Sequence, residues 1–478
     1  MQGKKKYQEK LFISFRLSDQ IPADNLYRRL NELIDFRFLR KATAQYYGTE
    51  GQKSIDPVVF MKLMLAGYLE NLSSDRRIIN TLRLRLDIRY FIGYDLDEEL
   101  PWHSTLSRTR QLYGEHVFTE LFRQVLKQCI DKGMVSGRRQ AVDSVFIKAN
   151  ASIDSMLAKE ILEDAKDYGK ELTANEDEKP AMKAIPEDDG PNGDKDIKKT
   201  NATHYSPVDP DARLSTKPGK PSNLNYLGQV SVDTASHVIT CVKAFLADKR
   251  DSQCLPSFLI HLKSNLKEND IGIMELVADT NYSSGTSLKT LQAMSITGYV
   301  PNTGRFKYEK EEFIYHSEED HYECRNGKTL AFSGISENDR RYIIGQKHCV
   351  GCPFKDMCIG EKKYMAVKVT IDKPYYDQMH IRMQSKKAAR LMKIRQSTVE
   401  PVIGTLVGYL GIKKVNSRGL DQANKCLTMA AVAYNIKKLL NYKPSPGINK
   451  QLQPKLKNAG DLFWALCCPL LNQISLYT

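Results

Sequence analysis

The apolar residues of the first third of the chain recur at the spacing of amphipathic helices. Between residues 55 and 94, runs such as "VVFMKLMLAGYLENL" place apolar side chains three and four positions apart. Asp56 followed by Pro57 is typical of a helix cap and first turn, and a second helix is expected to begin after Ser74 or Asp75 in "SDRRIINTLRLRLDIRYFIGY". We therefore predict an all-helical N-terminal domain over residues 1–135.

Farther along, apolar and polar residues alternate as they do in β-strands. "QAVDSVFIKA" predicts one strand, and "YLGQVSVD" and "HVITCVKAFLA", joined by "TAS", predict a hairpin. The helix-like "SQCLPSFLIHLKSNL" follows, then strand "GIMELVADT", helix "GTSLKTLQAM" and strand "ITGYVPN". This order predicts a mixed α/β fold, a five-stranded sheet with helices on both faces, built from residues 136–302 and 364–442. A long helix is expected from about Tyr376 past Arg395.

Three further segments are expected outside this sheet. Residues 161–222 hold seven of the 19 prolines and runs such as "NEDEKPAMKAIPEDDGPNGDKDIKK", which predicts a solvated insertion that need not pack. Residues 303–363 form a cysteine-rich insertion. Residues 443–478 form a C-terminal tail, in which polar residues and Pro469 interrupt the apolar stretch.

The net charge indicates which kind of partner the protein binds. With 71 Lys and Arg against 57 Asp and Glu, the net charge is +14, which favours a polyanion such as nucleic acid. No window reaches the roughly 18 consecutive apolar residues of a membrane span, and the start of the chain lacks the pattern of a secretion signal. We therefore expect no membrane partner and a cytoplasmic location with reduced thiols.

Arginines cluster on the predicted helices of the N-terminal domain. Guanidinium groups on a helical bundle suit contact with phosphates, and a helix that carries "STLSRTR" fits a major groove. The alternative is that these are basic, solvated faces of an ordinary bundle. The candidates for DNA contact are Arg76, Arg77, Arg108 and Arg110.

Three acidic residues are candidates for a metal site. Asp143 sits inside an apolar strand, where a carboxylate is costly unless it is paired or holds a metal. Asp279 ends another predicted strand, and Glu400 lies on the predicted long helix. Each has an alternative: Asp279 could form a turn, Glu400 could be an exposed helix residue, and Asp154 is a weaker rival of Asp143.

Carboxylates that converge from two strands and a helix would suit Mg²⁺ or Mn²⁺. Magnesium binds through a few carboxylates together with the phosphate oxygens of its substrate, which is the equipment for two-metal cleavage and strand transfer at a phosphodiester. The charge of Asp143 would then be neutralised by the cation.

Four cysteines between residues 324 and 358 have a metal-binding spacing. Cys324 precedes a C-x2-C-x5-C motif formed by Cys349, Cys352 and Cys358. This pattern predicts a tetrahedral structural zinc, with His321 and His348 as reserve ligands. An iron-sulfur cluster and free thiols are the alternatives.

Four motifs carry a resemblance to a known family. "QAVDSVFIKANAS", "VADTNYSS", "STVEPVIG" and "RGLDQANKCLTMAAVAYNIKKL", in this order behind a helical domain, resemble bacterial insertion-sequence transposases of the DDE class, which have a ribonuclease H-like catalytic domain. The likeness runs from about Asp19 to Leu440 and includes "DPDARLSTK". It implies that the metal-binding triad is Asp143, Asp279 and Glu400.

The resemblance also implies contacts with DNA. Arg395 belongs to the basic signature before the glutamate. Many relatives carry a lysine seven residues after the glutamate, and here that position is Val407. Lys413 and Lys414 are then the candidates for a phosphate or DNA-end contact.

The implied activity is that of a DNA transposase. Such an enzyme binds the terminal repeats of its own element on double-stranded DNA, cuts phosphodiester bonds and joins the freed ends to a target. Binding of two ends implies a homodimer or a higher homo-oligomer. The alternatives are a DNA-binding regulator that does not cut and a general metal-dependent nuclease.

Overall fold

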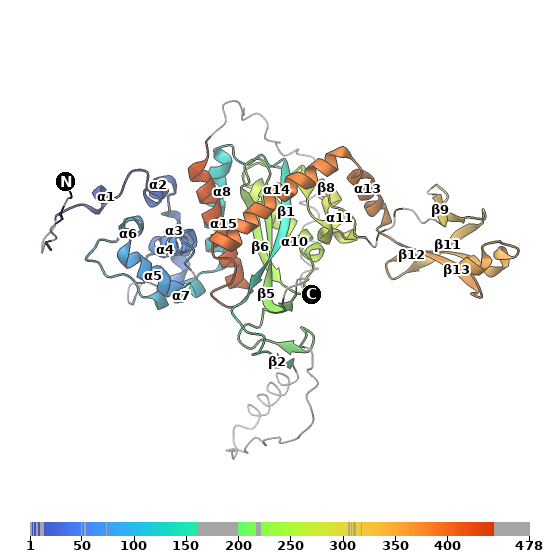
Figure 1. The fold of residues 1–478 in the computed structure, drawn as a ribbon, viewed down its shortest axis with the longest axis horizontal. Coiled ribbons are helices and arrows are strands. Elements are labelled where there is room, and N and C mark those ends of the chain that lie inside the picture. Colours follow the sequence, from blue (N-terminus) through green and yellow to red (C-terminus); the bar gives the residue numbers. More distant parts are fainter. Residues whose placement is uncertain are drawn as a thin grey trace, which may run out of the picture.

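The computed structural model describes residues 14–443, together with a few positions before residue 14 (Figure 1). Within this range it leaves out residues 49, 52–53, 73, 160–198, 217–220 and six positions between 305 and 317. The predicted tail therefore lies outside the described residues except for Lys443, and so does most of the predicted polar insertion. Figure 1 shows a helical region at one end, a central sheet, and a second sheet at the other end.

The N-terminal region is helical, as the sequence predicts. Asp56 accepts a hydrogen bond from the backbone of Val58, so the predicted cap is confirmed, and of the two candidates Ser74 and Asp75 it is Ser74 that caps the next helix, through the backbone of Arg77. The helices are α1 (Leu17–Gln20), α2 (Leu26–Leu33), α3 (Phe38–Thr43), α4 (Pro57–Leu69), α5 (Asp75–Leu84), α6 (Leu86–Ile92), α7 (His103–Leu112) and α8 (Glu115–Asp131), with a 3₁₀ turn η1 (Ala44–Tyr46).

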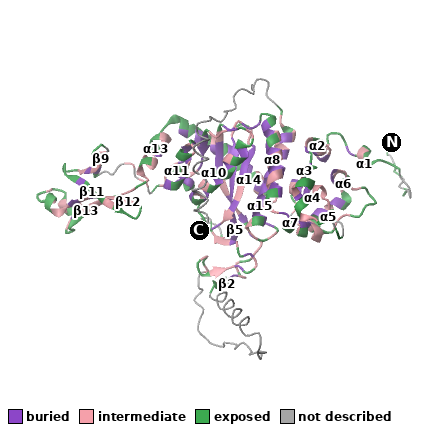
Figure 2. Cartoon of the chain, turned by 180° about the vertical axis from the view of Figure 1, so that it is seen from behind, coloured by how far each residue is buried: buried purple, intermediate pink, exposed green. Residues whose placement is uncertain are grey.

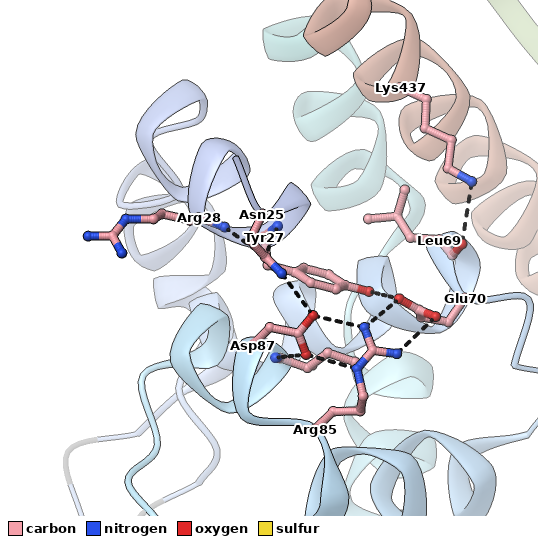
Figure 3. A network of polar contacts seen from close by, with 9 residues as sticks. Asn25, Tyr27, Arg28, Leu69, Glu70, Arg85, Asp87 and Lys437 are labelled. Atoms are coloured by element: carbon pink, nitrogen blue, oxygen red, sulfur yellow. Dashed lines mark hydrogen bonds and ion pairs between the residues drawn. The ribbon is translucent and has the colours of Figure 1, made fainter. Parts of the chain in front are cut away.

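A polar network explains why the second predicted helix is in fact two helices. Arg85 adopts an extended backbone between α5 and α6. Its guanidinium lies 2.8 Å from the carboxylate of Asp87 and 3.3 Å from that of Glu70, which also accepts a hydrogen bond of 2.8 Å from the hydroxyl of Tyr27 (Figure 3). These contacts join α2, α4 and α6 around Arg85. Continuing α5 through this residue would separate the guanidinium from its partners.

The central sheet is mixed, as predicted. Its strands lie in the order β6-β5-β1-β7-β8, where β6, β5 and β1 pair antiparallel and β1, β7 and β8 pair parallel. A sixth, short strand, β4, pairs with the beginning of β5. The strands are β1 (Arg139–Lys148), β4 (Arg213–Ser215), β5 (Asn223–Asp233), β6 (Ile239–Leu246), β7 (Glu275–Val277) and β8 (Thr297–Tyr299).

Helices cover both faces of this sheet. Phe146 of β1 packs beside Cys254 of α10. Asp143 lies an odd number of residues before Phe146 on the same strand, and it pairs with Arg395 of α14. Because side chains alternate across a strand, α10 and α14 lie on opposite faces. The helices that pack around the sheet are α10 (Asp251–Lys267), α11 (Gly285–Ala293), α13 (Lys373–Met383), α14 (Lys386–Tyr409) and α15 (Leu420–Asn441).

Helix α15 closes the outer edge of the sheet with two asparagines. The side chain of Asn435 accepts from the backbone N–H of Ile239 at 2.9 Å and donates to its carbonyl at 2.8 Å. Asn424 makes the same pair of contacts with Ala244 at 2.8 and 3.4 Å. Eleven helical residues and five strand residues both span about 16.5 Å, so the two amides match the free groups of β6 as a neighbouring strand would.

The same helix also joins the sheet to the N-terminal region. Of its 22 residues, 16 are buried, including Lys425, which is 1% exposed. The ammonium of Lys425 pairs with Asp421 at 2.5 Å and donates to the carbonyl of Arg110 at 3.3 Å. Lys437 donates to the carbonyl of Leu69 at 3.4 Å (Figure 3). The two regions therefore share one interior around α15, and Figure 2 shows buried residues along this helix and the central sheet.

The second sheet has a small core of its own. Its strands lie in the order β13-β12-β11-β10-β9 and surround Phe313, Tyr322, Leu330 and Tyr342. β13 belongs to this sheet, so the insertion that begins near residue 303 extends to Thr370 and the predicted end at 363 is wrong. The elements are β9 (Phe313–His316), β10 (His321–Cys324), β11 (Thr329–Ser336), β12 (Asp339–Gly345), η3 (Gln346–Cys349), α12 (Lys355–Cys358) and β13 (Tyr364–Thr370).

Two further predictions are corrected by the structure. The expected long helix from Tyr376 is divided into α13 and α14, because Ser385 is extended and caps α14 through the backbone of Ala388. Residues 199–216, which we expected to be solvated, are packed: β3 (His204–Tyr205) pairs with β2 (Leu157–Ala158), and Asp209 is wholly buried. Its carboxylate accepts from Tyr226 at 2.6 Å, which ties the segment to the central sheet.

The edge contact of α15 can be tested by substitution. Asn435→Ala would leave the N–H and the carbonyl of Ile239 buried without partners. We expect the free energy of unfolding to fall by about 2–4 kcal/mol, measured by urea denaturation. Asn441→Ala, at an exposed position of the same helix, should change it by less than about 0.5 kcal/mol. Equal effects of the two substitutions would contradict the role given to Asn435.

Candidate active site

Asp143 lies on β1, and Asp279 lies two residues after the end of the neighbouring strand β7. β1 pairs parallel to β7 with Ala141 opposite Val277, and the same register two residues on places Asp143 opposite Asp279. Adjacent strands are about 4.8 Å apart. The two aspartates therefore lie close together at the carboxyl end of β7, and the charge of Asp279 acts on Asp143.

Asp143 is held by an arginine from the covering helix. Nη2 of Arg395 lies 2.8 Å from its Oδ2, and Nε of the same guanidinium lies 3.4 Å from the carbonyl of Val142. Burial raises the pKa of the Asp143 carboxyl, Arg395 opposes this effect, and the charge of Asp279 adds to the rise. The strand thus carries its buried carboxylate at an energetic cost that one guanidinium only partly offsets.

Asp279 combines a structural and an electrostatic role. Its Oδ1 accepts from the backbone of Asn281 at 3.0 Å and caps the 3₁₀ turn η2 (Thr280–Tyr282). The alternative that Asp279 forms a turn is therefore correct, and the charge of its carboxylate also acts on Asp143. Its pKa is raised by burial, with Arg395 opposing and the charge of Asp251 adding to the rise.

Glu400 stands apart from the two aspartates in this structure. It lies on the exposed side of α14, about 140° around the helix from the buried Arg395 at 100° per residue. Within the part of the chain that the structure describes, no three His, Cys, Asp or Glu side chains gather closely enough to hold a metal ion. The structure therefore brings together Asp143 and Asp279, and it places Glu400 on the helix that covers them.

A third carboxylate near the pair is one that the sequence did not single out. Asp251 is the first residue of α10, and its charge contributes to the raised pKa of both Asp143 and Asp279. In the sequence it looks like an ordinary acidic residue in the first turn of a helix. Only its tertiary position marks it out.

The four cysteines line one cavity of about 200 Å³ in the second sheet domain. Burial raises the pKa of the Cys349 and Cys358 thiols, and the neighbouring cysteines add to the rise. The cavity therefore gathers Cys324, Cys349, Cys352 and Cys358, although their thiols do not converge into a metal-binding group here.

Two family models match the chain. Residues 15–112, which span α1 to α7, match a transposase domain (DUF772), and residues 323–440 match a transposase DDE domain. The chain belongs to the DDE-class transposases. The second match contains Glu400, Arg395 and the four cysteines, whereas Asp143 and Asp279 lie in the stretch between the two matches.

Solved structures with some likeness to this transposase are also transposases. The piggyBac transposase synaptic complex with hairpin DNA aligns at 10% identity and a TM-score of 0.27, over 90% of this chain and 84% of that one. The Mos1 transposase paired-end complex with left transposon end aligns at 9% identity and a TM-score of 0.17, over 57% and 70%. Scores this low carry no argument for the site. No curated protein matches the chain.

The structure separates the basic residues of this transposase into two groups. Arg76, Arg77 and Arg108 are exposed on α5 and α7, and Lys413 and Lys414 are exposed after α14. Arg110 and Arg395 are buried instead, at 5% and 8% exposure.

The two buried arginines are used by the fold. Arg110 pairs with Asp75 of α5, and Arg395 pairs with Asp143. The prediction that these two guanidiniums contact DNA is therefore wrong for the protein in this conformation, because neither reaches the surface.

None of the described helices is both long enough and apolar enough to cross a bilayer.

The raised pKa of Asp279 makes a prediction about stability. The Asp279 carboxyl stays protonated to a higher pH in the folded state than in the unfolded chain. The free energy of unfolding therefore falls as the pH rises from the ordinary pKa of an aspartate to the raised pKa of Asp279. Asp279→Asn keeps a capping oxygen and removes the charge. We expect it to raise the free energy of unfolding by about 0.5–2 kcal/mol at pH 7, measured by urea denaturation.

This gain should shrink as the pH is lowered toward the ordinary pKa of an aspartate. Glu400→Gln, at an exposed position, is the matched control and should leave stability within about 0.5 kcal/mol at every pH. A gain for Asp279→Asn that does not depend on pH would contradict the electrostatic account.

Proposed function

We propose that this protein is a DNA transposase that binds the terminal repeats of its insertion sequence, cleaves phosphodiester bonds at the element ends and transfers the strands to target DNA. The observation that carries the proposal is the pair of aspartates, Asp143 and Asp279, one strand spacing apart within a chain of the DDE transposase family. The strand order β6-β5-β1-β7-β8 supports a ribonuclease H-like catalytic domain, since three antiparallel strands precede two parallel crossovers.

The proposed active site consists of Asp143, Asp279 and Glu400. The support for the first two is that Asp143 lies on β1 and Asp279 follows the neighbouring strand β7. Glu400 follows Arg395 by about 7.5 Å along the axis of α14, and Arg395 contacts Asp143 directly. In our proposal α14 brings the glutamate to the aspartates when the site is loaded, and Arg395 keeps Asp143 oriented until then.

The donor set fits a hard divalent cation. Two partly buried carboxylates with raised pKa values face a single guanidinium, so the site has excess negative charge that a cation would neutralise. Magnesium or manganese, when bound, would supply Lewis-acid activation of a water or a 3′ hydroxyl and stabilisation of the leaving oxygen. The residues of the chain would hold the ions through their carboxylate oxygens and keep the two aspartates in register through β1 and β7.

The proposed DNA-binding surface is formed by exposed cations. Each phosphate contact from Arg or Lys releases counterions and makes binding dependent on salt. The side chains of Lys413 and Lys414 are exposed next to the end of β1, because the backbone of Lys148 pairs with that of Lys413 and Val415. The candidates are Arg76, Arg77, Arg108, Lys413 and Lys414. Contact with two element ends would require a homodimer or a higher homo-oligomer.

Cleavage of the element's own DNA terminus tests the proposal. Asp143→Asn, Asp279→Asn and Glu400→Gln should each lower the rate of Mg²⁺-dependent cleavage by at least about 10³-fold, because each removes a charge that holds the ions. Affinity for the same DNA, measured by fluorescence anisotropy, should stay within about threefold. A labelled terminal fragment incubated with Mg²⁺, Mn²⁺ or EDTA gives the readout.

Other results would point elsewhere. Tight binding by the wild type without any cutting would favour a regulator that holds the ends. Cutting that ignores the terminal sequence would favour a general nuclease. Full activity of Glu400→Gln would remove Glu400 from the site.

We further propose that the cysteine cavity holds a structural zinc ion. The support is that four thiols line one small cavity in the arrangement of one distant cysteine and a C-x2-C-x5-C motif. The six apolar residues buried in the second sheet form a small core, and a domain with so small a core commonly depends on a metal.

Loss of one thiol tests the zinc proposal. Cys349→Ser should lower the zinc content measured by atomic absorption from about one ion per chain to near zero. It should also make the second sheet sensitive to limited proteolysis. Cys241→Ser is the matched control, because Cys241 is buried in β6 away from the cavity and its substitution should leave the zinc content unchanged. Zinc-free wild-type protein would refute the proposal.

A further inference from the structure

A buried chain of hydrogen bonds links three elements around the two aspartates. Nε2 of Gln229 donates to Oδ1 of Asp251 at 2.7 Å, and the hydroxyl of Tyr282 donates to Oε1 of Gln229. The side chains of Gln229 and Tyr282 are both wholly buried. Their polar atoms therefore have no access to water and depend on each other.

Each member of the chain belongs to an element that carries or touches the site. Gln229 lies on β5 directly opposite Ser144, the residue after Asp143. Tyr282 is the last residue of η2, the turn that Asp279 caps. Asp251 begins α10. The hydrogen bonds thus connect the strand beside Asp143, the turn behind Asp279 and the start of a helix.

The direction of these hydrogen bonds is fixed by the carboxylate. An ionised aspartate only accepts, so the amide of Gln229 must turn its NH₂ toward Asp251 and its carbonyl toward Tyr282. The tyrosine hydroxyl must then donate to that carbonyl. One side-chain orientation satisfies all three groups, which makes the unit rigid.

The charge of Asp251 reaches the site itself. Burial is the main cause of the raised pKa of both Asp143 and Asp279, and Asp251 adds to the rise in each case. Gln229 therefore fixes the position of a carboxylate whose charge acts on both aspartates. The position of Asp251, which Gln229 sets, affects how strongly this region attracts a cation.

We propose that Gln229 and Tyr282 are positioning residues that hold Asp251 and the Asp279 turn in register with Asp143, and that they thereby set the affinity of the site for a divalent metal ion. This inference rests on the proposed metal-dependent function. In the proposed function neither Gln229 nor Tyr282 contacts the DNA or the reacting atoms. Partners that orient metal ligands typically account for a 10–100-fold difference in metal affinity.

Binding of Mn²⁺ to the full chain tests the inference without DNA cleavage. Electron paramagnetic resonance of free Mn²⁺ gives the dissociation constant, and thermal unfolding in EDTA gives the Tm. Tyr282→Phe removes one hydroxyl and should weaken Mn²⁺ binding by about 10-fold or more. Gln229→Met breaks both hydrogen bonds and should weaken it at least as much.

Tyr226→Phe provides a matched control for the loss of a buried hydroxyl. Tyr226 is also wholly buried and on β5, and its hydroxyl donates to the carboxylate of Asp209 at 2.6 Å. Its substitution should lower the Tm by an amount similar to that of Tyr282→Phe and leave Mn²⁺ affinity within about twofold. A purely structural role of Tyr282 would make the two variants alike in both measurements.

The outcomes separate this inference from the function on which it rests. Wild-type protein whose Mn²⁺ binding is absent, or is unchanged by Asp143→Asn, would refute the proposed metal site and the inference with it. Wild-type binding that depends on Asp143, together with unaltered affinity in Tyr282→Phe and Gln229→Met, would overturn the inference alone. Weakened affinity in these two variants and not in Tyr226→Phe would establish it.

Discussion

The arrangement of the protein depends on the contact between α15 and the outer edge of the central sheet. An edge strand exposes unpaired backbone groups, and leaving them buried without partners would cost several kcal/mol. Asn424 and Asn435 supply the missing partners from the helix. The helix can then be buried on nearly all sides. As a result β6 lies in the interior, although among the described strands it pairs with β5 alone.

Burial of α15 on its other sides couples the two halves of the chain. Lys425 can be buried because Asp421 and the carbonyl of Arg110 satisfy its ammonium. Arg110 in turn pairs with Asp75, so charged groups from three helices neutralise one another in the interior. The N-terminal helices, which carry the exposed arginines, therefore share one core with the sheet that carries the aspartates. In a transposase this rigid connection would fix the distance between the DNA that is held and the bond that is cut.

The candidate active site shows the opposite balance of charge. Burial disfavours the charges of Asp143 and Asp279, the charge of Asp251 adds to this effect, and Arg395 opposes it. A fold selected for stability alone would gain little from two partly buried carboxylates beside each other, because Arg395 offsets their cost only in part. The excess is understandable in a site that receives metal ions and the phosphates they bind. Buried hydrogen bonds through Gln229 and Tyr282 link Asp251 to the turn that Asp279 caps.

The sequence by itself determined the elements and the class of protein. Helix caps at Asp56 and Ser74, the hairpin of β5 and β6, and the placement of Asp143 and Asp279 follow from local chemistry, because periodicity and capping depend on neighbouring residues alone. Sequence motifs also carried the family resemblance, which the family matches bear out.

Tertiary structure decided which polar residues serve the fold and which remain available. Arg76 and Arg110 look alike in the sequence, yet one is exposed and the other is buried in an ion pair. Asp251 looks like a helix-start residue, and Asn435 looks like an unfavourable residue in a helix. The physical reason is that pairing, burial and charge depend on residues brought together from distant segments, as when Asn435 of α15 meets Ile239 of β6. No local sequence pattern encodes a contact between such distant segments.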